Sequence, residues 1–253
     1  MLRDAEGESV LVAVVADGAG SASMGLTGAT VMCQQVIAGM AGLLAAGLGV
    51  EDVRRQHFSV ILDAFQLEIA ALATAQSLRL RDFACTLVTA VLGREAAVFA
   101  QIGDGGIVVG HSPHEYLWVF WPEEGAPEEQ ASFRGEYANQ TRFATDADAQ
   151  ALLAFDYGGR RVEEIALFSD GLQRLTLDLA GIGAHEPFFA PLFQTMRSQP
   201  AFNSVEASAS LERFLNSPRV NERTDDDKTL ILATRRPLQH ATVDSVSRQA
   251  SGQ

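Results

Sequence analysis

The sequence predicts an α+β fold in which layered antiparallel strands carry helices on the outside. Three observations support this prediction. Two long helical segments lie next to each other near the N-terminus, a group of short strands follows them, and two further helices precede a final strand. This grouping differs from the regular strand–helix alternation of a doubly wound parallel sheet.

The composition indicates a globular chain with a substantial core. Its 253 residues are 47% apolar, which suits one large domain or two small ones. A formal charge of −13 argues against nucleic acid and anionic membranes as partners, and it suits a protein that binds cations. Cys33 and Cys85 have no CxxC spacing and no secretory signal precedes Val10, so we expect two core cysteines in a cytoplasmic protein.

Residues 26–50 predict the first helix. They carry no formal charge and are long enough to cross a bilayer, but Gln34 and Gln35 lie among them and no aromatic or basic anchors flank them. We therefore expect a buried helix rather than a membrane span. The apolar residues at spacings of three or four that predict its buried face are Ala29, Cys33, Val36, Met40 and Leu44.

Residues 51–76 predict a second helix that packs on the first. A stripe with alternating spacings of four and three predicts its buried face. The residues of this stripe are Val53, His57, Val60, Ala64, Leu67 and Ala71.

The remaining elements follow in order. Short apolar runs rich in β-branched or aromatic residues predict strands within 83–93, 96–110 and 115–122. A polar stretch over 123–150 predicts a long surface loop or flap, and its acidic residues predict a solvated surface rather than a substrate-selecting one. A strand at 163–171, helices near 187–197 and 205–215, and a strand at 228–234 complete a single domain over 1–236, followed by a disordered tail at 237–253.

Three of the apolar strands end in Asp-Gly, at Asp17, Asp104 and Asp170, and a run of three aspartates at 225–227 precedes the last strand. A single Asp-Gly is more often a turn than a ligand. Its recurrence at buried strand ends favours a site where several carboxylates share a small volume. Such carboxylates repel one another unless a cation compensates them, and Mg²⁺ or Mn²⁺ prefers oxygen ligands.

At these residues the sequence resembles the metal-dependent serine/threonine protein phosphatases of type 2C, in particular a bacterial subgroup. Four motifs appear in the family's order: "VVADGAG", "CTLVTAVL", "IGDGGIVV", and "LFSDGL" followed by "DDKTLIL". The segment "GEYANQTRF" is similar to one found in some bacterial members. Together these motifs span nearly the whole chain.

The resemblance implies a central sandwich of two antiparallel sheets flanked by helix pairs, with two Mn²⁺ or Mg²⁺ ions at one end. It also implies hydrolysis of phosphoserine and phosphothreonine proteins by a metal-activated water, with a partner kinase as an associated protein. One alternative is a pseudophosphatase that binds or regulates through an incomplete metal site. Another takes "DGAGSASMG" as the phosphate loop of a nucleotide-binding protein, although neither Gly-Lys-Ser/Thr nor GxGxxG is present.

The resemblance assigns roles to individual residues. Asp17 bridges both metals and Gly18 offers its carbonyl oxygen to one of them. Asp170 and Asp226 complete the ligands of the other metal, and Asp104 helps to hold a weaker third ion. Asp17 and Asp170 are accordingly the expected catalytic residues.

For residues near these motifs that are not expected ligands, we expect supporting roles or none. Asp227 is expected beside the ligands, Asp225 in solvent, and Thr86 in a structural role. Ala19 stands where some relatives have a histidine that is a candidate general acid, so proton donation falls to water. None of the five histidines lies in a motif: His57, His111, His114, His185 and His240.

The N-terminal region departs from the family. Relatives carry a further strand before residues 9–17, with an acidic ligand to the second metal and an arginine that meets the phosphate. Here the upstream acids are Asp4, Glu6 and Glu8, in a stretch that predicts a hairpin tip far from Asp17. We therefore expect one metal to bind well and the second poorly, and we expect the gene product to begin further upstream.

Overall fold

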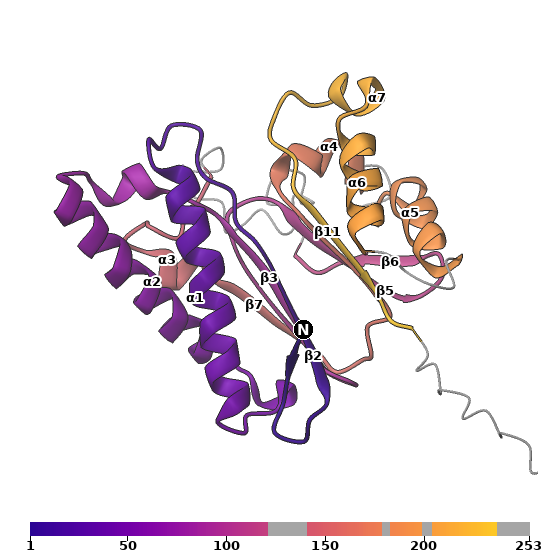
Figure 1. Cartoon of the computed structure of the whole chain (residues 1–253), viewed down its shortest axis with the longest axis horizontal. Coiled ribbons are helices and arrows are strands. Elements are labelled where there is room, and N and C mark those ends of the chain that lie inside the picture. The colour runs from indigo at the N-terminus through magenta and orange to yellow at the C-terminus, as the bar shows by residue number, and fades with distance from the viewer. Residues whose placement is uncertain (121–140, 179–182, 199–203, 237–253) are drawn as a thin grey trace, which may run out of the picture.

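Two antiparallel sheets form the centre of the protein in the computed structural model, which describes residues 1–120, 141–178, 183–198 and 204–236. The first sheet has the strand order β1-β2-β3-β4-β7 and the second has the order β11-β8-β5-β6. The sheets lie face to face with helices outside both of them, as Figure 1 shows. The predicted tail at 237–253 and most of the predicted flap lie outside the described residues.

The strands of the first sheet are β1 (Leu2–Arg3), β2 (Ser9–Val15), β3 (Leu87–Leu92), β4 (Ala97–Ile102) and β7 (Ala154–Gly158). Those of the second sheet are β5 (Gly106–Ser112), β6 (Glu115–Trp118), β8 (Glu164–Phe168) and β11 (Leu230–Thr234). A separate small ribbon pairs β9 (Leu177–Asp178) with β10 (Gly183–Ala184). Most strands of the two sheets were predicted, but β7 was not, because its sequence AFDYG shows no clear apolar alternation. The two-residue strands β9 and β10 were not predicted either.

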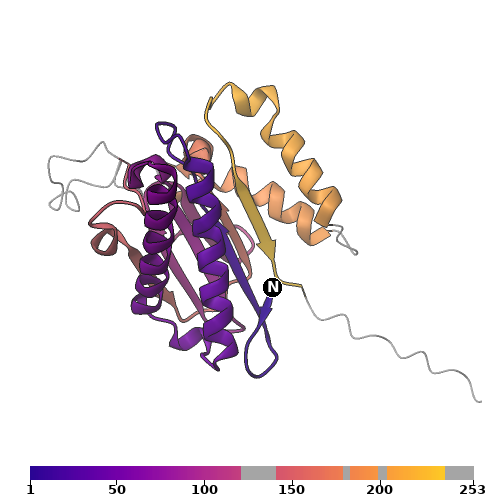
Figure 2. The same ribbon diagram turned by 60° about the vertical axis from the view of Figure 1, so that its left-hand side comes forward.

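Helices α1 (Gly25–Ala45) and α2 (Arg55–Gln76) cover the first sheet, and α5 (Glu186–Ser198) and α6 (Ser204–Leu215) cover the second (Figure 2). Short helices complete the chain: η1 (Val50–Asp52), η2 (Leu80–Phe83), α3 (Ala149–Leu152), η4 (Asp170–Leu172), α4 (Gln173–Thr176) and α7 (Pro218–Asn221). The order of layers is helix, sheet, sheet, helix, which confirms the predicted α+β sandwich.

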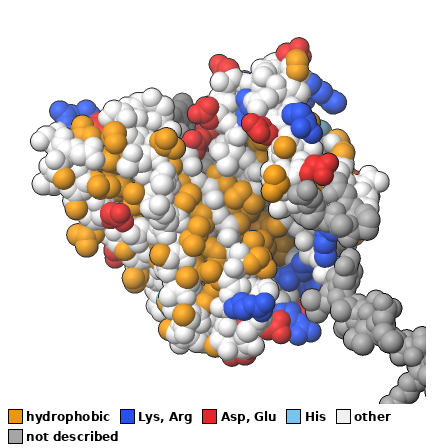
Figure 3. All heavy atoms as spheres, viewed as in Figure 1, with side chains coloured by type: hydrophobic (Ala, Val, Ile, Leu, Met, Phe, Trp, Pro, Cys, Tyr) orange, Lys and Arg blue, Asp and Glu red, His pale blue; other side chains and the backbone are white. Residues whose placement is uncertain are grey.

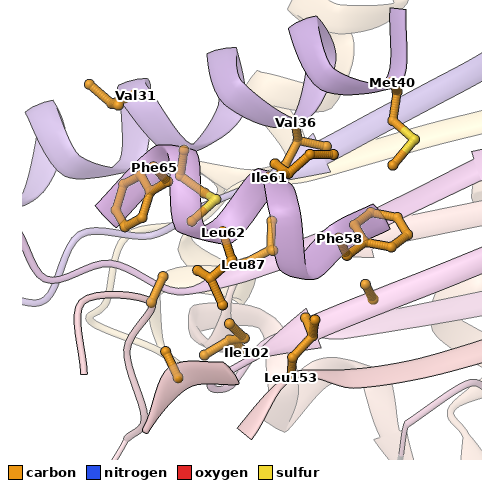
Figure 4. Close-up of a cluster of buried hydrophobic side chains, with 14 of the residues drawn as sticks. Val31, Val36, Met40, Phe58, Ile61, Leu62, Phe65, Leu87, Ile102 and Leu153 are labelled. Atoms are coloured by element: carbon orange, nitrogen blue, oxygen red, sulfur yellow. The ribbon is translucent and has the colours of Figure 1, made fainter. Parts of the chain in front are cut away.

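Three apolar clusters fill the spaces between these layers. In the first, Phe65 and Leu62 of α2 lie between α1 and the first sheet, opposite Leu87 and Ile102 (Figure 4). A second cluster lies between the two sheets, and a third joins the second sheet to α5, α6 and α7. These clusters supply the apolar burial that stabilises the sandwich.

The predicted buried face of α2 is wrong. Val60 and Leu67 are 67% and 75% exposed, and Ala64 and Ala71 are exposed as well. The residues that α2 buries are Phe58, Ile61, Leu62, Phe65, Ile69 and Ala73. Apolar residues surround much of this helix, and the stripe with the larger side chains is buried because it removes more apolar surface from water.

Helix α1 follows its prediction more closely. Ala29, Val36, Met40 and Leu44 are buried, whereas Cys33 is only partly buried, so the expectation of two core cysteines is right for Cys85 alone. By length and composition α1 and α2 could each cross a membrane. Both instead pack on the first sheet and on each other, and the space-filling view in Figure 3 shows apolar side chains scattered over their outer surface.

Two glycines of α1 give a matched pair for testing this packing. A Cβ at Gly28 would lie 2.0 Å from the carbonyl oxygen of Phe83, whereas a Cβ at Gly42 would meet nothing within 4 Å. We expect Gly28→Ala to lower the free energy of unfolding by about 1–3 kcal/mol, because η2 must move away from α1. Gly42→Ala should raise it by about 0.5–1 kcal/mol through helix propensity. Urea denaturation measures both, and equal effects would contradict the packing of α1 on η2.

Candidate metal centre

Asp17 follows the end of β2, and its backbone is fixed by the segment that leads into β3. The Asp17 N–H donates to Thr86 Oγ1 at 3.0 Å, and the Thr86 N–H donates to the Asp17 carbonyl oxygen at 2.8 Å. The next residue, Gly18, forms an isolated antiparallel bridge with Cys85. Thr86 is buried, so it has the structural role predicted for it and fixes the direction in which the Asp17 loop leaves the sheet.

Asp104 lies in the tight turn between β4 and β5. Its two neighbours have positive φ angles, +84° at Gly103 and +104° at Gly105, which favour glycine. A Cβ at Gly105 would lie 2.6 Å from the carbonyl oxygen of Phe168, so the turn is pressed against the end of β8. The Asp104 side chain also accepts a hydrogen bond, since Thr141 Oγ1 donates to Asp104 Oδ2 at 2.8 Å.

Asp170 and Asp226 come together because β8 and β11 pair, with Phe168 opposite Leu230. Asp170 begins η4 directly after β8, and Asp226 lies in the loop before β11. The Ser169 hydroxyl joins the two loops, since it donates to the Asp227 carbonyl oxygen at 3.2 Å and accepts the Thr229 N–H at 3.1 Å. Contact is so close that a Cβ at Gly171 would lie 2.2 Å from the Asp227 carbonyl oxygen.

The aspartates from these four places act on each other electrostatically. Burial raises the pKa of Asp17, and the carboxylates of Asp226, Asp227 and Asp104 raise it further, while a hydrogen bond with Asp170 lowers it. Burial also raises the pKa of Asp170 to about 7, with additional contributions from Asp104, Asp226 and Asp17. Several acidic side chains lie on the upper part of the surface in Figure 3. The predicted convergence of the strand ends is therefore present.

One atom of the cluster indicates how a cation fits. Asp170 Oδ1 is buried and has no hydrogen-bond partner, although a buried carboxylate oxygen needs a donor or a cation. Within the described ranges, no three histidine, cysteine or acidic side chains are gathered closely enough to form a finished metal site. Coulomb repulsion acts over longer distances than metal–ligand bonds, so the carboxylates are neighbours without being at ligand spacing. The donor set suits Mg²⁺ or Mn²⁺, and the assignment of ligands stays a prediction.

The supporting residues are mostly where they were expected. Asp227 acts on Asp17, and Asp225 is exposed and is not among the charges that raise the pKa of Asp17 or Asp170. No histidine is among those charges either. Ser169 and Thr141 were not predicted, since a serine or threonine beside a turn carries no signal of the distant loop that it contacts.

The N-terminal acids lie at the other end of β2. Leu2 pairs with Val10 and Arg3 with Ser9, and Gly7 has a φ of +80° at the hairpin tip between them. The eight residue steps from Ser9 to Asp17 span roughly 25 Å of extended chain. Asp4, Glu6 and Glu8 belong to this hairpin, as predicted, and do not contribute to the carboxylate cluster.

Comparisons with known proteins match this arrangement. The family model described as protein phosphatase 2C matches residues 2–216. Serine/threonine-protein phosphatase 3 of Escherichia coli (strain K12) is 37% identical over 229 residues, which cover 89% of this chain and 84% of the relative.

Solved structures show the same fold at low sequence identity. The serine/threonine phosphatase Stp1 from Staphylococcus aureus is 14% identical with a TM-score of 0.58, and the match covers 93% of this chain and 87% of that one. The catalytic domain of the serine/threonine protein phosphatase PstP in complex with two manganese ions is 18% identical with a TM-score of 0.55, and the match covers 89% and 86% of the two chains.

Proposed function

This chain belongs to the protein phosphatase 2C family, and from that premise we propose that it is a metal-dependent phosphatase that hydrolyses phosphoserine and phosphothreonine in proteins. The observation that carries the proposal is the cluster of strand-end aspartates, among which Asp170 Oδ1 is buried without a hydrogen-bond partner. These aspartates occupy the family's motifs in the family's order. Within the described residues nothing favours a pseudophosphatase. The match to the phosphatase family over residues 2–216 argues against the alternative of a nucleotide-binding protein.

Asp17, Asp170 and Asp226 would hold one Mn²⁺ or Mg²⁺ ion. The Gly18 carbonyl oxygen would join Asp17 at a second ion, and Asp104 would help to hold a weaker third. When bound, a divalent cation of this kind offsets phosphoryl charge and activates water for in-line displacement. The choice between Mn²⁺ and Mg²⁺ is open, because both prefer oxygen ligands.

The chain itself contributes orientation and charge. Thr86 holds both backbone groups of Asp17, and Ser169 ties the Asp170 loop to the Asp226 loop, so the carboxylates are positioned before any ion arrives. In the metal-free protein the Asp170 carboxyl keeps its proton up to about pH 7. Because the metal ligand must be deprotonated, cation binding and loss of this proton are coupled.

Further parts of the proposal concern the second ion and the cellular setting. We propose that a second ion binds weakly, because the hairpin acids lie at the far end of β2. Phosphoprotein substrates imply a kinase that supplies them, so a partner kinase is part of the proposal. The free thiols of Cys33 and Cys85 support a cytoplasmic location, and the acidic charge argues against nucleic-acid and membrane partners.

Hydrolysis assays with two substrates test the function. The purified protein should hydrolyse a phosphothreonine peptide and a small aryl phosphate when Mn²⁺ is present, and a chelator should remove the activity. Renewed addition of Mn²⁺ should restore it. Binding of Mn²⁺ without hydrolysis of either substrate would favour the pseudophosphatase.

A further inference from the structure

The segment 141–144 contacts two of the loops that carry the aspartates of the cluster. Thr141 bonds to Asp104, and the Arg142 carbonyl oxygen lies so near Gly103 that a Cβ there would be 2.5 Å from it. The Ala144 N–H donates to the Cys85 carbonyl oxygen at 2.8 Å, and Cys85 is the residue that bridges Gly18. Arg142 is therefore anchored between the Asp104 turn and the Asp17 loop.

A phosphate monoester must approach this cluster against its charge. The leading charges that act on Asp17 and Asp170 are carboxylates from three other loops. Four or five aspartates carry more negative charge than one divalent cation neutralises. A doubly charged phosphoryl group therefore needs a positive side chain beside the metal.

Lys228 and Arg142 are basic residues on segments that contact the cluster. The Lys228 ammonium donates to the Asp226 carbonyl oxygen at 3.2 Å, which directs it to the backbone of its own loop. Arg142 is half-buried and directly follows Thr141, whose hydroxyl donates to Asp104, and a guanidinium presents a planar pair of donors that fits two phosphate oxygens at once.

We propose that Arg142 binds the phosphoryl group of the substrate. This inference rests on the proposed function, because it names the group that holds the substrate in the same site. These contacts place the backbone of Arg142 at the margin of the cluster, and Arg142 is not among the predicted metal ligands. Arg142 thus binds substrate and product phosphate, while the aspartates bind the metal.

Arg142→Gln and Arg142→Lys test the assignment in the full chain with saturating Mn²⁺. For Arg142→Gln we expect KM for a phosphothreonine peptide and the inhibition constant of inorganic phosphate to rise about 10- to 100-fold, as for a lost charge-assisted hydrogen bond. Arg142→Lys should recover part of the loss because it restores the charge without the planar pair of donors. The Mn²⁺ concentration for half-maximal activity should stay unchanged.

Arg94→Gln is the matched control. Arg94 is exposed after the other end of β3, opposite the end that carries Thr86, so its loss should leave KM and phosphate inhibition unchanged. Unchanged phosphate inhibition in Arg142→Gln would overturn the inference while an active wild type keeps the proposed function. The inference would also be overturned if weaker Mn²⁺ binding or a lower melting temperature were the only defect of Arg142→Gln. An inactive wild type would instead contradict the proposed function, and calorimetric binding of phosphate to the Mn²⁺-loaded variants would still decide the role of Arg142.

Discussion

Asp170→Asn should remove almost all hydrolysis, with kcat/KM for a phosphothreonine peptide falling by at least about 10²–10³-fold at saturating Mn²⁺. The substitution keeps the size of the side chain but takes one charged ligand from the cation. The control is Asp225→Asn, since Asp225 is exposed in the acidic run that contains Asp226 and is not among the charges that raise the pKa of Asp17 or Asp170. Wild-type activity in Asp170→Asn would show that Asp170 is no metal ligand.

The same variant should be more stable than the wild type when no metal is present, which separates lost function from misfolding. The pKa of Asp170 lies at about 7 in the folded protein and at about 4 in an unfolded chain. The folded state then binds more protons between these values, so the stability of the metal-free wild type falls as pH rises from about 4 to 7. Asp170→Asn lacks this titration, and thermal melting with a chelator at pH 5 and pH 8 should show a smaller decrease in melting temperature.

Asp17→Asn should abolish both hydrolysis and the stabilisation by Mn²⁺. In the wild type, Mn²⁺ at 100 times its dissociation constant should add about 2.7 kcal/mol to the free energy of unfolding. Asp17 is half-buried, receives the charge of Asp226, Asp227 and Asp104, and shares a hydrogen bond with Asp170, so it is the residue through which the cluster is connected. A thermal-shift series with increasing Mn²⁺ measures the effect.

Asp156→Asn is the control for Asp17→Asn, because Asp156 is an exposed aspartate of the same sheet, on β7. It should keep the full response to Mn²⁺. If Asp17→Asn also kept that response, the ion would have to bind elsewhere in the chain.

The strand ends were predictable because Asp-Gly after an apolar run marks both a turn and a sheet edge. Three such turns at Asp17, Asp104 and Asp170 indicated a common edge, and pairing of β8 with β11 brings the Asp226 loop to the same place. The links through Ser169 and Thr141 depend on the register of distant strands and loops. The residues next to Ser169 and Thr141 in the sequence do not indicate that register.

Helix α2 shows where periodicity is insufficient. Two apolar stripes run along it, and spacing alone selected the one with Val60 and Leu67, which is exposed. The stripe with Phe58 and Phe65 is buried because its larger side chains fill the space between α1 and the first sheet. The size of the side chains, rather than their period, decides the orientation of such a helix.

Calorimetric titration of the metal-free wild type with Mn²⁺ tests whether the strand-end aspartates hold a divalent cation. We expect one tight site per chain and a second, much weaker one, with proton release near pH 7 as Asp170 gives up its proton. The tight site should disappear in Asp17→Asn and Asp170→Asn and persist in Asp225→Asn. Two equally tight sites would contradict the weak second ion, and a tight site that survives both substitutions would contradict the metal centre itself.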